Sequence, residues 1–253
     1  MRGKITRQLL EKRRKCRLHF TLIDPDKVDE EHAVKISLKA KAAGTDAFLV
    51  GGSLGVAEPG LSRIVKLIKE STGLPVILFP SNVNGLTPAA DAVLFLYLLN
   101  TMDPYYLSGA QLQGALIVLR MGLEPIPTAY VIVGHGGAAG YIGYARPVPY
   151  DKPEIAAAYA LAGAMMGAQI VYLEAGSGAP RPVPQEAVSM TRKLLEQANL
   201  GTLIAVGGGV RDPHAARDMA KAGADILITG NVAEEDPDAL YDIISSFKED
   251  CKP

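Results

Sequence analysis

Short apolar runs typical of strands alternate with helix-like runs along the whole chain of 253 residues. The predicted strands span 19–24, 47–51, 75–79, 92–97, 128–133, 169–174, 203–206 and 225–229. Strands that alternate with helices indicate βαβ units and a parallel sheet. Eight buried strands in about 250 residues are typical of a closed (β/α)8 barrel, the TIM barrel. We therefore predict a single α/β domain over residues 1–253.

The connection between the third and fourth predicted strands is unusually short, because it spans only residues 80–91. The residues in it that break helical periodicity are Pro80, Asn82, Asn84, Gly85 and Pro88. A full crossover helix does not fit easily into this segment. We expect a modified barrel in which the third helix is missing or replaced by a short loop, so that a slot is open on that side.

Charge and hydropathy exclude several classes of protein. The net charge of −1 argues against a nucleic-acid-binding protein, which usually carries a basic excess. Every apolar stretch is interrupted well short of about 18 residues, which predicts no transmembrane segment. We interpret the basic residues near the start as a solvated first helix, with a peripheral contact to anionic lipid as the alternative. They are Arg2, Lys4, Arg7, Lys12, Arg13, Arg14, Lys15 and Arg17.

The sequence contains two cysteines, Cys16 and Cys251. They lie far apart in the sequence, and neither belongs to a metal-spaced or redox pair. We therefore expect a cytoplasmic protein in which both thiols are reduced.

Three consecutive predicted strands near the end of the chain each run into a glycine-rich turn. The turns are 175–178, 207–209 and 230–231. Glycine lets a backbone approach a ligand closely, and free N–H groups ahead of a helix form a cradle for an anion. Because the carboxyl ends of parallel strands meet on one face of a barrel, the three turns predict one phosphate site.

Polar side chains at the strand ends are candidates for catalysis. Tyr172 and Glu174 share one face of their strand, where they can hydrogen-bond the hydroxyls of a small polyol phosphate, or Glu174 can act as a base. Asp24 ends the first strand, and a single carboxylate suits Mg²⁺ when substrate phosphates complete its shell. Ser53 follows two glycines; it either completes the shell of the metal ion or only forms a turn. For Asp26, the same two interpretations stand side by side: a functional carboxylate or a turn residue.

The helix predicted over 104–121 is strongly apolar. Its large aliphatic residues are Leu107, Leu112, Leu116, Ile117 and Leu119. We expect them to pack in the core, with a wall for an apolar substrate as the alternative, since the helix lies next to the expected slot. The four histidines show no spacing typical of a zinc site.

Several motifs together resemble the geranylgeranylglyceryl phosphate synthase family, which includes bacterial heptaprenyl relatives. The motifs are Leu22 to Lys27, Gly51 to Ser53, Phe79 to Asn82, Tyr172 to Gly178, Val206 to Val210 and Thr229 to Asn231. The resemblance implies a barrel without its third helix. It also implies a Mg²⁺-dependent prenyltransferase that joins geranylgeranyl diphosphate to the C3 hydroxyl of sn-glycerol 1-phosphate and releases pyrophosphate. This is an early step of archaeal ether-lipid synthesis, and relatives form homo-oligomers.

The resemblance also assigns roles to residues of this sequence. The metal residues map to Asp24 and Ser53, and we assign catalysis to Glu174, Tyr172 and Asp24. The glycerol phosphate contacts map to Tyr172, Leu173, Glu174, Ala175, Gly176, Ser177, Gly178, Gly208, Gly209, Gly230 and Asn231. Some members carry a lysine where this chain has Leu22, so Lys27 becomes a candidate partner for the diphosphate.

Two other functions remain open at this point. Phosphosugar isomerases and synthases of histidine or tryptophan biosynthesis also use glycine turns after late strands. They usually need an acid and a base at the ends of opposing strands. The predicted strand 128–133 contains no carboxylate that could act as the partner of Asp24 in such a pair. A non-catalytic phosphometabolite sensor would bind the glycerol phosphate without any dependence on Mg²⁺.

Overall fold

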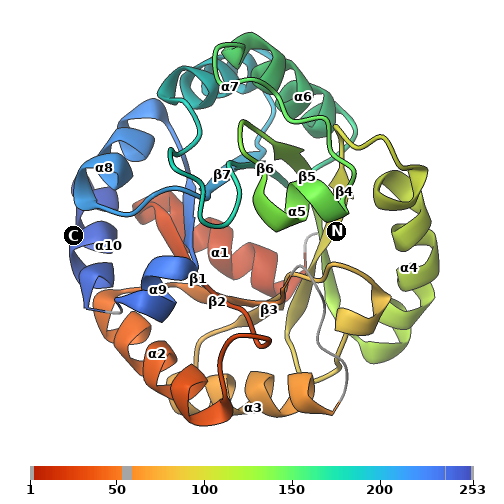
Figure 1. The fold of residues 1–253 in the computed structure, drawn as a ribbon, viewed down its shortest axis with the longest axis vertical. Helices are drawn as coiled ribbons and strands as arrows, with labels where there is room; N and C mark the ends of the chain where they lie inside the picture. The colour runs from red at the N-terminus through yellow and green to blue at the C-terminus, as the bar shows by residue number, and fades with distance from the viewer. Residues whose placement is uncertain (1–2, 53–58, 237, 252–253) are drawn as a thin grey trace.

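Eight parallel strands close into a barrel in the order of the sequence, as predicted (Figure 1). The computed structural model describes residues 3–52, 59–236 and 238–251. The strands are β1 (Leu18–Ile23), β2 (Ala47–Val50), β3 (Val76–Leu78), β4 (Ala92–Leu98), β5 (Glu124–Ile132), β6 (Ile170–Glu174), β7 (Leu203–Gly207) and β8 (Ile226–Thr229). Seven begin within one residue of the predicted start, whereas β5 begins four residues before it. The fold is a TIM barrel.

Helices surround the barrel and cross its two ends (Figure 1). They are α1 (Lys4–Lys15), α2 (Glu30–Ala43), α3 (Gly60–Thr72), α4 (Ala110–Met121), α5 (Gly137–Ile142), α6 (Pro153–Met165), α7 (Gln185–Gln197), α8 (Pro213–Ala222), α9 (Asn231–Glu235) and α10 (Ala239–Phe247). One π-helical turn, η2 (Tyr105–Gly109), leads into α4. The sequence did not predict α5 and α9, which are too short to show a clear helical period.

The expected gap in the ring of helices is present. Between β3 and β4 the chain forms only the 3₁₀ turn η1 (Val83–Gly85). The side chain of Asn82 caps this turn by accepting a hydrogen bond from Asn84 N at 2.8 Å. The barrel therefore lacks its third crossover helix, and α4 is the next helix along the ring.

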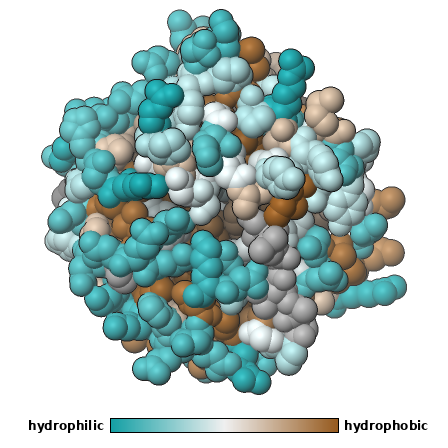
Figure 2. All heavy atoms as spheres, in the orientation of Figure 1, coloured by the Kyte–Doolittle hydropathy of each residue, from teal (hydrophilic) through white to brown (hydrophobic). Residues whose placement is uncertain are grey.

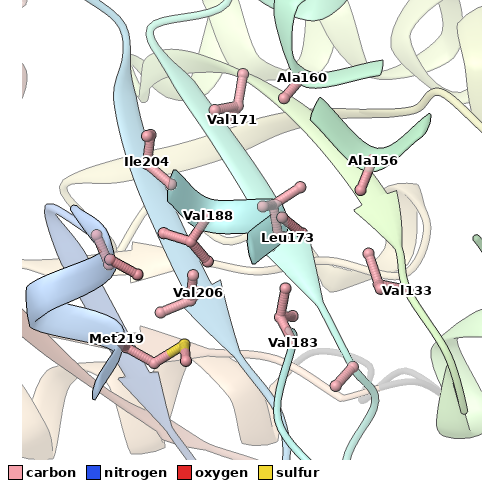
Figure 3. Close-up of a cluster of buried hydrophobic side chains, with 14 of the residues drawn as sticks. Val133, Ala156, Ala160, Val171, Leu173, Val183, Val188, Ile204, Val206 and Met219 are labelled. Atoms are coloured by element: carbon pink, nitrogen blue, oxygen red, sulfur yellow. The ribbon is translucent and has the colours of Figure 1, made fainter. Parts of the chain in front are cut away.

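The core has an inner and an outer layer, because successive side chains of a strand point to opposite faces. Phe20, Leu49 and Ile77 belong to the cluster inside the barrel. Leu173 and Val206 point outward, and Figure 3 shows them packed with Val188 of α7, among others. The glycine turns are thus fixed to strands that are packed on both faces.

The first helix is less solvated than the sequence predicts. Ile5 and Leu9 of α1 are buried in the cluster inside the barrel. The first backbone N–H groups of α1 donate to Glu124 at the start of β5, from Ile5 N at 2.7 Å and from Thr6 N at 2.8 Å. One face of α1 therefore closes the amino-terminal end of the barrel.

The expectation of two reduced thiols is wrong in this structure, because Cys16 and Cys251 form a disulfide. Cys16 caps the end of α1, and Cys251 follows α10. Their Cα atoms lie 4.8 Å apart although 235 residues separate them in the sequence. Spacing along the chain could not reveal this pair, since only the folded barrel brings its two ends together.

The leucines of α4 do not pack in the core as expected. Leu112, Leu116 and Leu119 are 80%, 61% and 75% exposed, whereas Val118 is buried in a core cluster and Ile117 packs against it. Figure 2 shows apolar atoms protruding at the edge of the molecule where Figure 1 places α4. In the described ranges 3–52, 59–236 and 238–251, no helix is long and apolar enough to cross a membrane.

Candidate active site

The three glycine-rich turns lie side by side at the carboxyl end of the barrel. Ser177 Oγ, after β6, donates to Asn231 Oδ1, after β8, at 2.7 Å. Between them, the backbone of Gly208 lies directly against Glu174 and Gly176. Asp212 caps α8 by accepting from Ala215 N at 2.9 Å, and Pro213 follows it as the first residue of the helix. The turns therefore form one concave surface of backbone groups, which suits an anion.

Two glycines in this surface have conformations that other residues rarely adopt. Gly176 has φ +106° and Gly208 has φ +77°. A Cβ atom on Gly176 would collide with the backbone of Gly136 and Gly137, just before and at the start of α5. A Cβ atom on Gly208 would collide with the Glu174 carboxylate. Glycine is required at both positions by backbone conformation and by close approach.

Glu174 lies inside this surface and is only 6% exposed. Its Oε1 accepts a hydrogen bond from Gly176 N at 2.6 Å. Burial raises the pKa of the Glu174 carboxyl, while hydrogen bonds from Tyr172 and Gly176 N oppose that rise. Burial and the nearby carboxylate of Glu174 hold the pKa of the Tyr172 phenol well above its ordinary value. Tyr172 therefore stays protonated and can donate a hydrogen bond.

Two aromatic residues that sequence reasoning did not assign to the site complete its floor. The rings of Tyr130 and Tyr172 lie 5.0 Å apart between centroids, and Phe79 lies 5.8 Å from Tyr130 and 5.9 Å from Tyr172. Tyr130 belongs to the inward-facing series of β5 with Ile126 and Ile132, so the period of that strand could have shown that it faces the interior of the barrel. These rings fix the position of Tyr172 beside Glu174.

Asp24 lies at the end of β1, on the opposite side of the same cavity. Its carboxylate accepts from Asp26 N at 3.1 Å and lies 3.8 Å from Lys27 Nζ. Lys27 also pairs with Glu234 of α9 at 3.4 Å, a carboxylate that was not among the predicted site residues. Burial raises the pKa of Asp24, and the hydrogen bond from Asp26 N and the charge of Lys27 partly offset that rise.

A metal ion at this side would depend on Asp24. Ser53, the second predicted ligand, lies outside the described residues. Gly52, immediately before it, lies with its backbone against the Asp24 carboxylate. In the described part of the chain, no three His, Cys, Asp or Glu side chains are grouped to hold a metal. Asp24 alone fits an ion that takes one or two carboxylates and several non-protein oxygens, as Mg²⁺ does.

The three aromatic rings and the side chains of Asp24, Glu174 and Glu234 border one cavity of about 510 Å³. Its polar end contains Asp24, Glu174 and the glycine turns, and its apolar end lies between β4 and α4, where the crossover helix is missing. Leu86, Val93 and Phe95 line the apolar end. A ligand that fits the whole cavity has a charged head and a hydrocarbon tail.

Most of the predicted site residues border this cavity. They are Asp24, Tyr172, Glu174, Ser177, Gly178, Gly208, Gly209, Gly230 and Asn231. Gly176 contributes its N–H to Glu174 instead. The side chains of Leu173 and Ala175 are buried in the cluster outside the barrel, which follows from their alternation with Tyr172 and Glu174.

The fold and the cavity define the chain as a TIM-barrel protein with an anion cradle and an apolar slot in one site. The chain belongs to the PcrB family, whose model matches residues 8–248. It is 56% identical to the geranylgeranylglyceryl phosphate synthase of Aeropyrum pernix over 98% of each chain. It is 50% identical to the enzyme of that name from Thermofilum pendens, over 93% of this chain and 90% of the relative.

A solved structure with a bound ligand is also similar to this chain. It is the (S)-3-O-geranylgeranylglyceryl phosphate synthase of Thermoplasma acidophilum in complex with its substrate sn-glycerol-1-phosphate. The two chains superpose with a TM-score of 0.92 at 36% identity, covering 98% of this chain and 99% of the other.

Proposed function

We propose that this protein is a prenyltransferase that joins geranylgeranyl diphosphate to the C3 hydroxyl of sn-glycerol 1-phosphate. The products are geranylgeranylglyceryl phosphate and pyrophosphate, in an early step of ether-lipid synthesis. The observation that carries the proposal is the single cavity in which an anion cradle, a buried carboxylate and an apolar slot meet. The names of the relatives and the substrate bound to the similar structure support it.

The acceptor substrate fits the polar end of the cavity. Its phosphate would accept hydrogen bonds from the backbone N–H groups of the turns after β6, β7 and β8. Its hydroxyls would then lie near Tyr172 and Glu174, which are buried at the base of this surface. Glu174 orients the C3 hydroxyl toward the donor and accepts its proton as the new ether bond forms, while the C1 carbon of the prenyl group loses pyrophosphate.

Asp24 is the residue of the described chain best suited to hold Mg²⁺. Its carboxylate borders the cavity, and burial disfavours its charge unless a cation is close. A bound Mg²⁺ would neutralise charge on the leaving diphosphate. Lys27, which now pairs with Asp24 and Glu234, can provide a second positive charge at the same place. This would compensate for Leu22, where some relatives carry lysine.

The hydrocarbon tail of the donor fits the slot left by the missing crossover helix. Leu86, Val93 and Phe95 offer apolar surface there. Each buried CH₂ group contributes about 0.8 kcal/mol, so the tail would supply much of the affinity for the donor. We further propose that the protein works in the cytoplasm as a homo-oligomer, which would cover the exposed leucines of α4.

A transfer assay tests this function. Purified protein is incubated with radiolabelled sn-glycerol 1-phosphate, geranylgeranyl diphosphate and Mg²⁺, with the sn-3 isomer and EDTA as controls. We expect label in the organic phase only with the sn-1 isomer and Mg²⁺. Absence of transfer with prenyl donors of every length would exclude the synthase and favour an isomerase or a sensor.

The Asp24→Asn variant separates an enzyme from a sensor. An enzyme should lose turnover by a factor of about 100 or more, since the charge that holds the ion is lost, and yet keep its affinity for glycerol phosphate. Calorimetric titration with sn-glycerol 1-phosphate measures that affinity. Equal transfer by the variant and the parent would show that Asp24 holds no essential ion.

A further inference from the structure

The turn after β1 places a lysine beside the carboxylate that would hold Mg²⁺. Residues 24–27 form a tight turn, which is closed by a hydrogen bond from Lys27 N to Asp24 O at 3.0 Å. Asp24 Oδ1 accepts from Asp26 N at 3.1 Å, and Asp24 Oδ2 lies 3.8 Å from Lys27 Nζ. The carboxylate oxygen that the turn leaves unused therefore faces an ammonium group, which competes with a metal ion for it.

A second carboxylate, from a distant part of the chain, also pairs with Lys27. Lys27 Nζ donates a hydrogen bond to Glu234 Oε2 at 3.4 Å, a shorter distance than to Asp24. The other oxygen of Glu234 accepts from Asp24 N at 3.4 Å. The Glu234 side chain is only 13% exposed, whereas that of Lys27 is 47% exposed and has a flexible four-carbon stem. Glu234 is thus the fixed member of this pair, and Lys27 is the adjustable one.

The helix that carries Glu234 fixes the position of its side chain. The backbone N–H groups of Ala233 and Glu234 donate to Gly230 O, at 2.8 Å and 3.2 Å. Ala233 is completely buried in a core cluster. α9 begins at Asn231, which borders the cavity in the third glycine turn. The same short helix therefore contributes its first residue to the anion cradle and pairs with Lys27 through its fourth.

We propose that Glu234 is a positioning residue that holds the Lys27 ammonium away from Asp24, so that Asp24 stays available to the metal ion. This inference rests on the proposed function, because that function supplies the reason for an ion at Asp24. Without the charge of Glu234, the ammonium would move onto Asp24, to which the turn already brings it within 3.8 Å. Held by Glu234, it instead remains beside the ion, where it can contact the diphosphate of the donor.

The test measures the binding of Mn²⁺, used as a probe for Mg²⁺, by electron paramagnetic resonance of the free ion in the absence of substrates. We expect Glu234→Gln to weaken Mn²⁺ binding by about fivefold, the effect of one partly exposed ion pair that moves onto Asp24. In a protein that already carries Lys27→Met, the same change should have almost no effect, because no ammonium remains to occupy Asp24. The Mg²⁺ concentration for half-maximal transfer should rise by a similar factor in Glu234→Gln.

Glu235→Gln is the matched control, because it removes the same charge from an exposed position of the same helix. It should bind Mn²⁺ as the parent does. If Glu234→Gln does not fold, Glu234→Asp takes its place in both backgrounds, since aspartate keeps the charge but reaches less far towards Lys27.

Three results would overturn the proposal. An equal loss of Mn²⁺ affinity with and without Lys27 would show that Glu234 acts on the ion directly. Unchanged Mn²⁺ binding in the folded Glu234 variant would show that Lys27 does not compete for Asp24, and a parent that binds no Mn²⁺ would remove the ion from the argument. Normal Mn²⁺ binding without prenyl transfer by the parent would instead overturn the proposed function and leave the role of Glu234 standing.

Discussion

The carboxyl group of Glu174 is buried, and burial disfavours its charged form. The neighbouring hydrogen-bond donors determine how readily it ionises. Burial raises its pKa, whereas the phenol of Tyr172 and the N–H of Gly176 stabilise the charged form. A carboxylate with a raised pKa is a better base than an ordinary glutamate at neutral pH. In the proposed reaction, Glu174 can therefore both orient the C3 hydroxyl of the acceptor and accept its proton.

We predict that Glu174→Gln lowers kcat by a factor of about 10² to 10⁴, because glutamine keeps the shape but accepts no proton. In the parent, activity should fall on the acid side at a higher pH than for an ordinary glutamate, since the raised pKa lets Glu174 protonate earlier. A pH profile of kcat/KM measures both effects. A glutamine variant with nearly full kcat would show that Glu174 only positions the substrate.

His19 is a second buried titratable residue, and it affects stability. It lies 3.0 Å from Thr45 Oγ1 and 3.0 Å from Thr229 Oγ1 within the barrel. Burial, with a smaller effect of the charge on Lys248, lowers the pKa of His19 from 6.5 to about 3. The folded protein therefore keeps His19 neutral at a pH where the unfolded chain protonates it.

Stability should accordingly decrease as the pH falls from 6.5 towards 3, because the unfolded state binds the extra proton. Between pH 7.5 and 4.5 the loss due to His19 should be roughly 2–3 kcal/mol. Urea unfolding of the parent and of His19→Gln at both pH values measures this. The variant should lose less stability on acidification; equal losses would mean that His19 is not neutral in the folded state.

At the scale of elements, the amino-terminal helix depends on a residue that follows it by more than a hundred positions. Gly3 caps α1 without a side chain, and Glu124 of β5 accepts hydrogen bonds from Ile5 N, Thr6 N and Thr6 Oγ1. A carboxylate at a helix N-terminus both satisfies free N–H groups and complements the helix dipole. This contact fixes α1 across the barrel end.

We predict that Glu124→Ala lowers the free energy of unfolding by roughly 2 kcal/mol, because charge-assisted hydrogen bonds to partly buried groups are lost. Glu11→Ala, at an exposed position of the same helix, is the control and should change little. Chemical denaturation gives the free energies, and amide exchange should show faster opening of α1 in Glu124→Ala alone. Similar losses in the two variants would contradict a capping role.

Among the elements, long periodic segments were predictable and short ones were not. The helical period of the sequence predicts a helix over 30–43, and α2 has the same bounds. The absent crossover helix was also predictable, since too few residues separate β3 from β4. The orientation of α4 was predicted wrongly, because its leucines surround much of the helix and periodicity alone does not say which face meets the barrel.

At the scale of the whole molecule, the disulfide joins the two ends of the chain. Cys16 ends α1 beneath the barrel, and Cys251 follows the last helix. The ion pair of Arg17 with Asp250, at 3.6 Å, brings the neighbouring residues together as well. A cross-link over 235 residues restricts the unfolded chain strongly.

We predict that replacing Cys16 and Cys251 by serine lowers the free energy of unfolding by about 2–4 kcal/mol. Urea unfolding of the parent with and without reductant measures the same cross-link by a second route. The reduced parent should resemble the double variant, which reductant should not affect. A parent whose unfolding midpoint is insensitive to reductant would show that the disulfide does not contribute to stability.

The sequence by itself determined the barrel and most of its polar site. Strand and helix periods are local, and glycine turns lie directly after the strands that carry them, so Tyr172, Glu174, Gly208 and Asn231 were predictable from neighbouring residues. The tertiary structure alone decided which distant groups meet. Tyr130 beside Tyr172, Glu234 beside Lys27 and the cystine at the chain ends all join residues far apart in sequence. No local period encodes such contacts, because they form only when the barrel closes.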